Sequence, residues 1–216
     1  MTTRSFIFAL VPAIFGLLTT GCSHAPKDYT QFQAHRPRSI LVLPPLNEST
    51  DVSATYSCLC SITRPLAEMG YYVYPVSLTD GLLKANGLPT PGEMHQIPLN
   101  KVHEIIGADA VLYLTVKQYG TKYIIISSET VVRMDGKLVD VATGATLWQG
   151  SGLAVDNSGG SGNPIVDLIG AAVTQVINSS VDHAHEIAPL ACWNLAATPS
   201  QGLLFGPYSP KSGTPP

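Results

Sequence analysis

The chain has 216 residues, a formal net charge of −3 and few charged side chains, 12% in all. It has no surplus of basic residues, which argues against nucleic acid as a partner. The length suits one domain of ordinary size with additional terminal segments. A surface this poor in charge is typical of a protein that packs against another molecule.

The amino terminus has the pattern of a secretory signal peptide. Arg4 is the only charged residue before Lys27, and residues 6–18 are apolar apart from glycine and proline. One positive charge followed by an apolar run of this length predicts a cleaved signal peptide over residues 1–21. The run is shorter than the roughly 20 apolar residues that a membrane-spanning helix requires.

A lipid-attachment motif follows the apolar run. Residues 19–22 read TTGC and resemble the lipobox of bacterial lipoproteins, with Thr19 where the lipobox usually has leucine. The resemblance implies cleavage between Gly21 and Cys22 and acylation of Cys22. Two or three acyl chains, at about 0.8 kcal/mol per buried methylene, make a stable anchor. Ser23 follows the cysteine in place of aspartate, which by the sorting rule of Gram-negative lipoproteins implies the outer membrane.

Three further cysteines are present, Cys58, Cys60 and Cys192. The oxidising periplasm allows disulfides. Cys58 and Cys60 lie roughly 200° apart around a predicted helix, so they are not expected to bond each other. A disulfide of Cys192 with Cys58 or Cys60 would leave one thiol over, and the alternative is that these cysteines are buried small apolar side chains. The C-x-C spacing does not fit zinc, and we predict no metal site.

The first part of the folded chain predicts a unit of strand, helix and strand. Residues 22–37 are polar and predict a lipidated tether, which leads into a strand over residues 39–43. A helix that begins after Asp51 or Ser53 as its cap is ended by Gly70 and followed by a strand over residues 71–76. A right-handed parallel crossover is expected. The side chains expected to be buried on this helix are Tyr56, Leu59, Ile62, Leu66 and Met69.

The middle of the chain predicts two more helices and then antiparallel strands. Helices over residues 78–87 and 99–106 precede an apolar central strand over residues 110–116. Glycines indicate turns beyond it, at Gly120, at residues 135–136 (DG) and at residues 143–144 (TG). The strands expected between these turns cover residues 123–133, 137–141 and 146–155.

The last part predicts a long helix and a tail. Residues 163–181 have apolar side chains at helical spacing and predict an amphipathic helix against the sheet. Residues 196–216 are rich in proline and lack periodicity, which predicts a disordered tail. We therefore expect one mixed α/β domain over residues 38–195, with a parallel start, an antiparallel meander and a long C-terminal helix, in two layers or a three-layer-like arrangement.

No motif for a specific chemistry is found. The glycines of residues 159–162 lack the Lys-Ser/Thr of a phosphate loop and favour a flexible linker. His183 and His185 would face different sides of a helix, so they do not easily share a metal ion. Ser57 lacks a nucleophile-elbow context. We expect no catalytic residue and no cofactor, and we identify no small-molecule substrate.

Several blocks of the sequence resemble a family of Gram-negative outer-membrane lipoproteins of unknown function. These blocks are residues 40–52, 65–76, 109–116 and 138–140, with Leu147, Trp148 and Gly150. The resemblance extends over about residues 1–205, in the order and spacing of the blocks. The family in turn resembles the amino-terminal domain of TolB and the periplasmic domain of CsgG, the curli-secretion lipoprotein. This implies a mixed α/β sandwich and carries over no catalytic residue.

Three functional hypotheses follow. The favoured one is a lipid-anchored outer-membrane lipoprotein whose domain faces the periplasm and acts as a non-enzymatic envelope adaptor or assembly factor. Its expected partner is an envelope protein or a second copy of the chain. The first alternative is a ring-forming secretion component similar to CsgG, although residues 123–155 alternate only partly for a membrane barrel. The second alternative is an enzyme with an unrecognised site.

Overall fold

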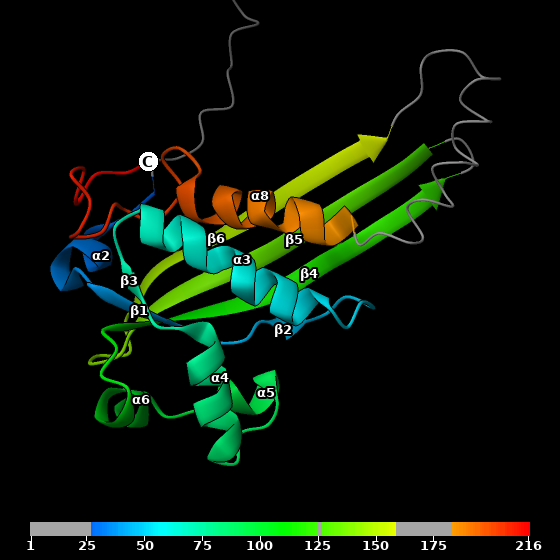
Figure 1. The fold of residues 1–216 in the computed structure, drawn as a ribbon. Helices are drawn as coiled ribbons and strands as arrows, with labels where there is room; N and C mark the ends of the chain where they lie inside the picture. Colours follow the sequence, from blue (N-terminus) through cyan, green and yellow to red (C-terminus); the bar gives the residue numbers. More distant parts are fainter. Residues whose placement is uncertain (1–26, 125–126, 159–182) are drawn as a thin grey trace, which may run out of the picture.

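The computed structural model describes residues 27–124, 127–158 and 183–216. The predicted signal peptide, Cys22 with its cleavage site, and the helix expected over residues 163–181 lie outside these ranges. Six strands form one sheet in the order β3-β1-β4-β5-β6, with β2 beside β4 (Figure 1). The strands are β1 Ser39–Val42, β2 Leu46–Asn47, β3 Tyr72–Val73, β4 Ala110–Ile124, β5 Ser127–Asp140 and β6 Thr146–Ser158.

The sheet combines both kinds of strand pairing. Strand β1 runs parallel to β3 and to β4, and β2 is also parallel to β4. Strands β4, β5 and β6 then form an antiparallel meander. The predicted mixed α/β fold, with a parallel start and an antiparallel continuation, is confirmed.

Helices cover the two faces of the sheet to different extents (Figure 1). On one face lie α3 and α8, side by side along the long strands. Among the described residues, the other face is covered near β1, where Leu41 and Leu43 pack with Met94 and Val102 in a second, smaller core. These described elements form three layers at β1 and two layers along the rest of the sheet. The helices are α2 Thr30–His35, α3 Ala54–Glu68, α4 Val76–Ala85, α5 Pro91–Met94, α6 Leu99–Ile105 and α8 His183–Ala197.

Helix α3 confirms the predicted helix, with one correction to its buried stripe. Leu59, Ile62 and Leu66 are buried as expected, but Tyr56 is 43% exposed. At about 100° per residue, Tyr56 lies well off the line of the three apolar residues. Its ring lies instead against Lys84, whose Nζ is 5.0 Å from the ring centroid. Gly70, at φ +90°, lets the chain turn back at the helix end.

Two predicted turns are wrong because the strands run through them. Strand β4 continues through Gly120, and β5 continues through Asp135 and Gly136. Gly136 allows close packing, since an added Cβ would lie only 3.2 Å from the side chains of Leu195 and Trp148, which would have to shift slightly. In a strand, glycine marks close approach as well as a turn. The turn at residues 143–144 is confirmed, with Gly144 at φ +74°.

The parallel start also differs in detail. The strand expected over residues 71–76 is reduced to β3, because Pro75 precedes the first residue of α4. Between α4 and α6, Thr90 and Glu93 form a capping box that starts α5.

The expectation of a disordered tail over residues 196–216 is wrong. Leu203 and Leu204 are buried in the main core, and the Tyr71 hydroxyl donates to the carbonyl of Leu204. Gly206 N donates to Met69 O at 2.9 Å. An added Cβ at Gly206 would overlap the Gly70 carbonyl, so glycine allows this close approach. Burial of two leucines outweighs the lack of periodicity that predicted disorder.

The segment predicted as a tether is also partly folded. Helix α2 lies within it, and the Phe32 side chain is only 4% exposed in the main core. Across the described part of the chain, no helix is long and apolar enough to cross a membrane.

Candidate functional site

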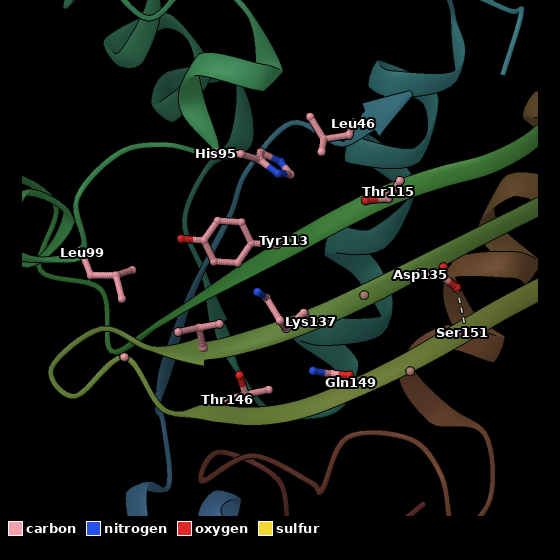
Figure 2. A pocket seen from close by; sticks show the side chains of 14 residues that line it. Leu46, His95, Leu99, Tyr113, Thr115, Asp135, Lys137, Thr146, Gln149 and Ser151 are labelled. Carbon is pink, nitrogen blue, oxygen red and sulfur yellow. Dashed lines mark hydrogen bonds between the residues drawn. The ribbon is translucent and has the colours of Figure 1, made fainter. Parts of the chain in front are cut away.

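A groove of about 890 Å³ lies on the face of the sheet that α3 and α8 do not cover. Side chains alternate along a strand, so Leu112, Leu114 and Leu138 point into the main core while their neighbours point into the groove. Figure 2 shows these neighbours on three adjacent strands, with His95 above them and Leu99 to the left of Tyr113. The strand residues that line the floor include Tyr113 and Thr115 on β4, Asp135 and Lys137 on β5, and Gln149 and Ser151 on β6.

His95 forms part of the groove wall. Its Nε2 lies 2.9 Å from the carbonyl of Pro44, which can only accept, so Nε2 carries the proton of this hydrogen bond. Burial lowers the pKa of His95 below its usual value, and the nearby charge of Lys137 acts in the same direction. The ring packs edge to face on Tyr113 at 5.3 Å between centroids. These contacts hold the ring in place.

The groove floor carries one cation and one carboxylate on β5. Lys137 Nζ lies 5.5 Å from the centroid of the Tyr113 ring, a cation–π distance. Asp135 Oδ1 accepts a hydrogen bond of 2.8 Å from the Ser151 hydroxyl. The two charges are separated along the strand by Gly136. The floor therefore offers separate positive, negative and hydrogen-bonding positions along its length.

Two of the titratable side chains of the groove have hydrogen-bond partners close by. Among its lining residues, His95 is held by Pro44 and Asp135 by Ser151, and the two are not bonded to each other. In the ranges that the structure describes, no group of three or more His, Cys, Asp or Glu side chains could hold a metal ion. The chemistry available is hydrogen bonding, stacking and ion pairing.

A second polar cluster joins the two helices to the sheet. Ser57 Oγ on α3 lies 2.8 Å from His185 Nδ1 on α8, and the Tyr119 hydroxyl on β4 donates to Ser57 Oγ at 2.9 Å. Ser57 and Tyr119 are buried. No local pattern predicts this cluster, because its members are separated by 62 and 128 positions. It links α3, β4 and α8 beneath the helical layer.

The two histidines considered as a metal pair are directed to different partners. His183 Nδ1 lies 3.1 Å from Glu186 Oε2, while His185 contacts Ser57. The predicted divergence of their side chains agrees with these separate contacts.

The structure has Cys58, Cys60 and Cys192 as free thiols. Cys192 is buried against Cys58. The Cys192 sulfur lies 3.8 Å from the Cys58 carbonyl oxygen and 3.7 Å from the Met134 sulfur. Burial raises the pKa of Cys58 to about 12 and that of Cys192 well above its usual value. Cys60 is exposed, away from the buried pair. Of the two pairings considered, only Cys58 with Cys192 has its residues in contact.

Comparisons with known proteins identify the family. The profile of the family described as "Putative lipoprotein GNA1162-like" matches residues 27–208. The chain is 41% identical over 198 residues to "Putative lipoprotein NMB1124/NMB1162" of Neisseria meningitidis serogroup B, which covers 90% of this chain and 92% of the relative. The crystal structure of lipoprotein GNA1162 from Neisseria meningitidis matches with a TM-score of 0.54 and 44% identity, over 66% of this chain and 99% of that one. The chain therefore belongs to the GNA1162-like lipoprotein family.

Proposed function

We propose that this protein is anchored in the outer membrane by lipid on Cys22 and that its domain acts as a non-enzymatic adaptor or assembly factor of the cell envelope. The observation that carries the proposal is membership of a lipoprotein family combined with the lipobox-like TTGC at residues 19–22. Removal of residues 1–21 would make Cys22 the first residue of the mature chain.

The adaptor role is supported by the groove on the uncovered sheet face. Its floor spans three strands and carries apolar as well as polar side chains, which gives an open surface instead of an enclosed pocket. Lys137 and Asp135 could pair with opposite charges of an extended segment, and Gln149 could hydrogen-bond to its backbone. Such a surface suits a protein segment better than a small molecule, which usually binds in an apolar cavity.

The anchor is tested by Cys22→Ala. We expect the variant to accumulate as an unprocessed precursor without acyl chains, measured by mass spectrometry of the amino-terminal peptide and by membrane fractionation. Cys60→Ala is the matched control, because Cys60 is exposed and should not affect processing. A Cys22→Ala protein that is processed and acylated normally would contradict the proposal.

The adaptor role is tested by crosslinking in cells. A photo-reactive residue at Gln149 in the groove should capture one defined envelope protein or a second copy of the chain. The same residue at Leu78, which is 70% exposed on α4, is the control. If position 149 gives no product beyond that of position 78, the groove is not the adaptor surface.

A further inference from the structure

Lys27 is fixed to the folded domain. Its Nζ donates to the carbonyl of Gln149 on β6 and, at 3.1 Å, to the carbonyl of Gln201 after α8. The same ammonium lies 4.8 Å from the centroid of the Trp148 ring. Its burial lowers the pKa of Lys27. Two residues later, the Tyr29 hydroxyl donates to the carbonyl of Gly202 at 2.6 Å. The chain is therefore part of the domain from Lys27 onward.

The distance between anchor and domain is consequently short. Only five peptide steps separate Cys22 from Lys27, and they span at most ~18 Å even when fully extended. A domain of this size has a radius of gyration of roughly 16 Å. The domain thus cannot move away from the bilayer by more than about its own radius, and the side bearing Lys27 must face the lipid. This step rests on the proposed acylation of Cys22.

Helix α8 ends at the same place. The carbonyl of Ala196, in its last turn, accepts from Leu203 N at 2.8 Å, and Gly202 packs against that carbonyl. Gln201, next to Gly202, is one of the residues that hold Lys27. Figure 1 shows the end of α8 near α2 and the C-terminus.

The outer surface of α8 near this end is apolar. Leu190 is 52% exposed and Trp193 is 40% exposed, while Ala188, Cys192 and Leu195 face the core. After Glu186 the helix contains no charged residue. A helix that is apolar on its outer side as well as its inner side is expected to have a partner there. Tryptophan is favoured where an apolar surface meets the water boundary of a membrane.

We propose that the outer surface of α8 around Leu190 and Trp193 contacts the membrane that holds the Cys22 anchor. The short connection brings this surface to the bilayer, and the absence of charge lowers the cost of its contact with the acyl chains. The contact fixes the orientation of the domain, with β6 and α8 near the lipid. Leu190 and Trp193 supply a second, weaker attachment besides the acyl chains.

Tryptophan fluorescence tests the contact, because the chain has two tryptophans and Trp148 is buried. The acylated full-length protein is reconstituted into phosphatidylethanolamine–phosphatidylglycerol vesicles with brominated acyl chains, which quench at short range. We expect quenching and a blue shift of Trp193 emission. Trp193→Phe should remove both changes, leaving the emission of Trp148.

Two further variants test the reasons given. Insertion of about twelve Gly and Ser residues before Pro26 adds roughly 20 Å of root-mean-square reach, so it should weaken the quenching while acylation is retained. Leu190→Gln should also weaken the quenching of Trp193. Leu78→Gln is the control, because Leu78 is exposed on α4 and should not affect the quenching.

The outcomes separate this inference from the proposed function. Mass spectrometry of the amino-terminal peptide is done on the same sample. A peptide without acyl chains would overturn both the anchor and the contact. An acylated protein whose Trp193 is not quenched would overturn the contact alone and leave the anchor in place. Equal quenching with the longer connection would overturn the statement that the short connection brings this surface to the bilayer.

Discussion

The two faces of β4 and β5 differ in what they carry. On one face, Leu114 and Leu138 lie under α3 and α8 in the main core. On the other face of the same strands, Tyr113 and Lys137 line an open groove. Because side chains alternate between the two faces of a strand, adjacent residues lie in different environments. The residues that stabilise the fold lie beneath the helices, and the residues available for recognition are their immediate neighbours in the sequence.

The largest expected effect comes from cutting a side chain on the covered face. Leu138→Ala should lower the free energy of unfolding by about 2–5 kcal/mol, since it leaves a cavity beside Trp148 and α8. The adjacent Lys137→Ala, on the groove side, should change it by no more than about 0.5 kcal/mol. Urea unfolding of both variants measures the difference. Equal losses would contradict the division between the two faces.

A smaller effect is expected from the polar cluster beneath the helices. Tyr119→Phe and Ser57→Ala should each lower the free energy of unfolding by about 1 kcal/mol, because each removes the hydrogen bond between Tyr119 and Ser57. The double variant should lose less than the sum of the two, since both changes delete the same bond. Tyr208→Phe, at a tyrosine that is 66% exposed, is the control. Strict additivity would show that the bond contributes nothing.

A still smaller, pH-dependent effect is expected on the groove side. Burial lowers the pKa of His95 in the folded chain, so the unfolded chain takes up a proton there more readily. The free energy of unfolding should therefore fall as the pH is lowered through about 6.5. Above that range His95 is unprotonated in both states, so it causes no such loss of stability. His95→Gln should flatten the profile, and His103→Gln, at an exposed histidine on α6, should not. Urea unfolding between pH 5 and pH 8 measures this pH dependence. Parallel profiles for the unmodified protein, His95→Gln and His103→Gln would contradict its assignment to His95.

The smallest effect on stability is expected for the thiols, which differ instead in accessibility. Among Cys58, Cys60 and Cys192, only Cys60 should react with a thiol reagent in the native protein, because Cys58 and Cys192 are buried and burial raises the pKa of both. After unfolding without a reductant, Cys58 and Cys192 should react as well. If only one of the three reacts after unfolding, Cys58 and Cys192 form the disulfide that the sequence also allowed.

Local patterns were enough to predict most of the elements. The apolar spacing of Leu59, Ile62 and Leu66 predicted α3, and Gly70 predicted its end. The predictions failed where a residue has two physical uses. Gly136 was interpreted as a turn residue, but it allows close packing beneath α8. The same ambiguity affected residues 196–216, whose prolines predicted disorder although Leu203 is buried.

The candidate groove could not be predicted because it depends on contacts between distant segments. His95 reaches it from the connection before α6, while Asp135 and Gln149 come from two different strands. No spacing of residues along the chain predicts that these three side chains line the same groove. The cluster of Ser57, Tyr119 and His185 has the same origin, since three separate elements supply one residue each.

A lipobox-like motif and the period of apolar residues are local properties, so the amino-acid sequence was enough to predict a lipoprotein with a mixed α/β fold. Three features follow from the folded structure: which face of the sheet α3 and α8 cover, the attachment of Lys27 to the domain, and the exposure of Leu190 and Trp193 on α8. These features depend on packing between residues far apart in the chain. Side-chain burial is settled only when all elements are in place.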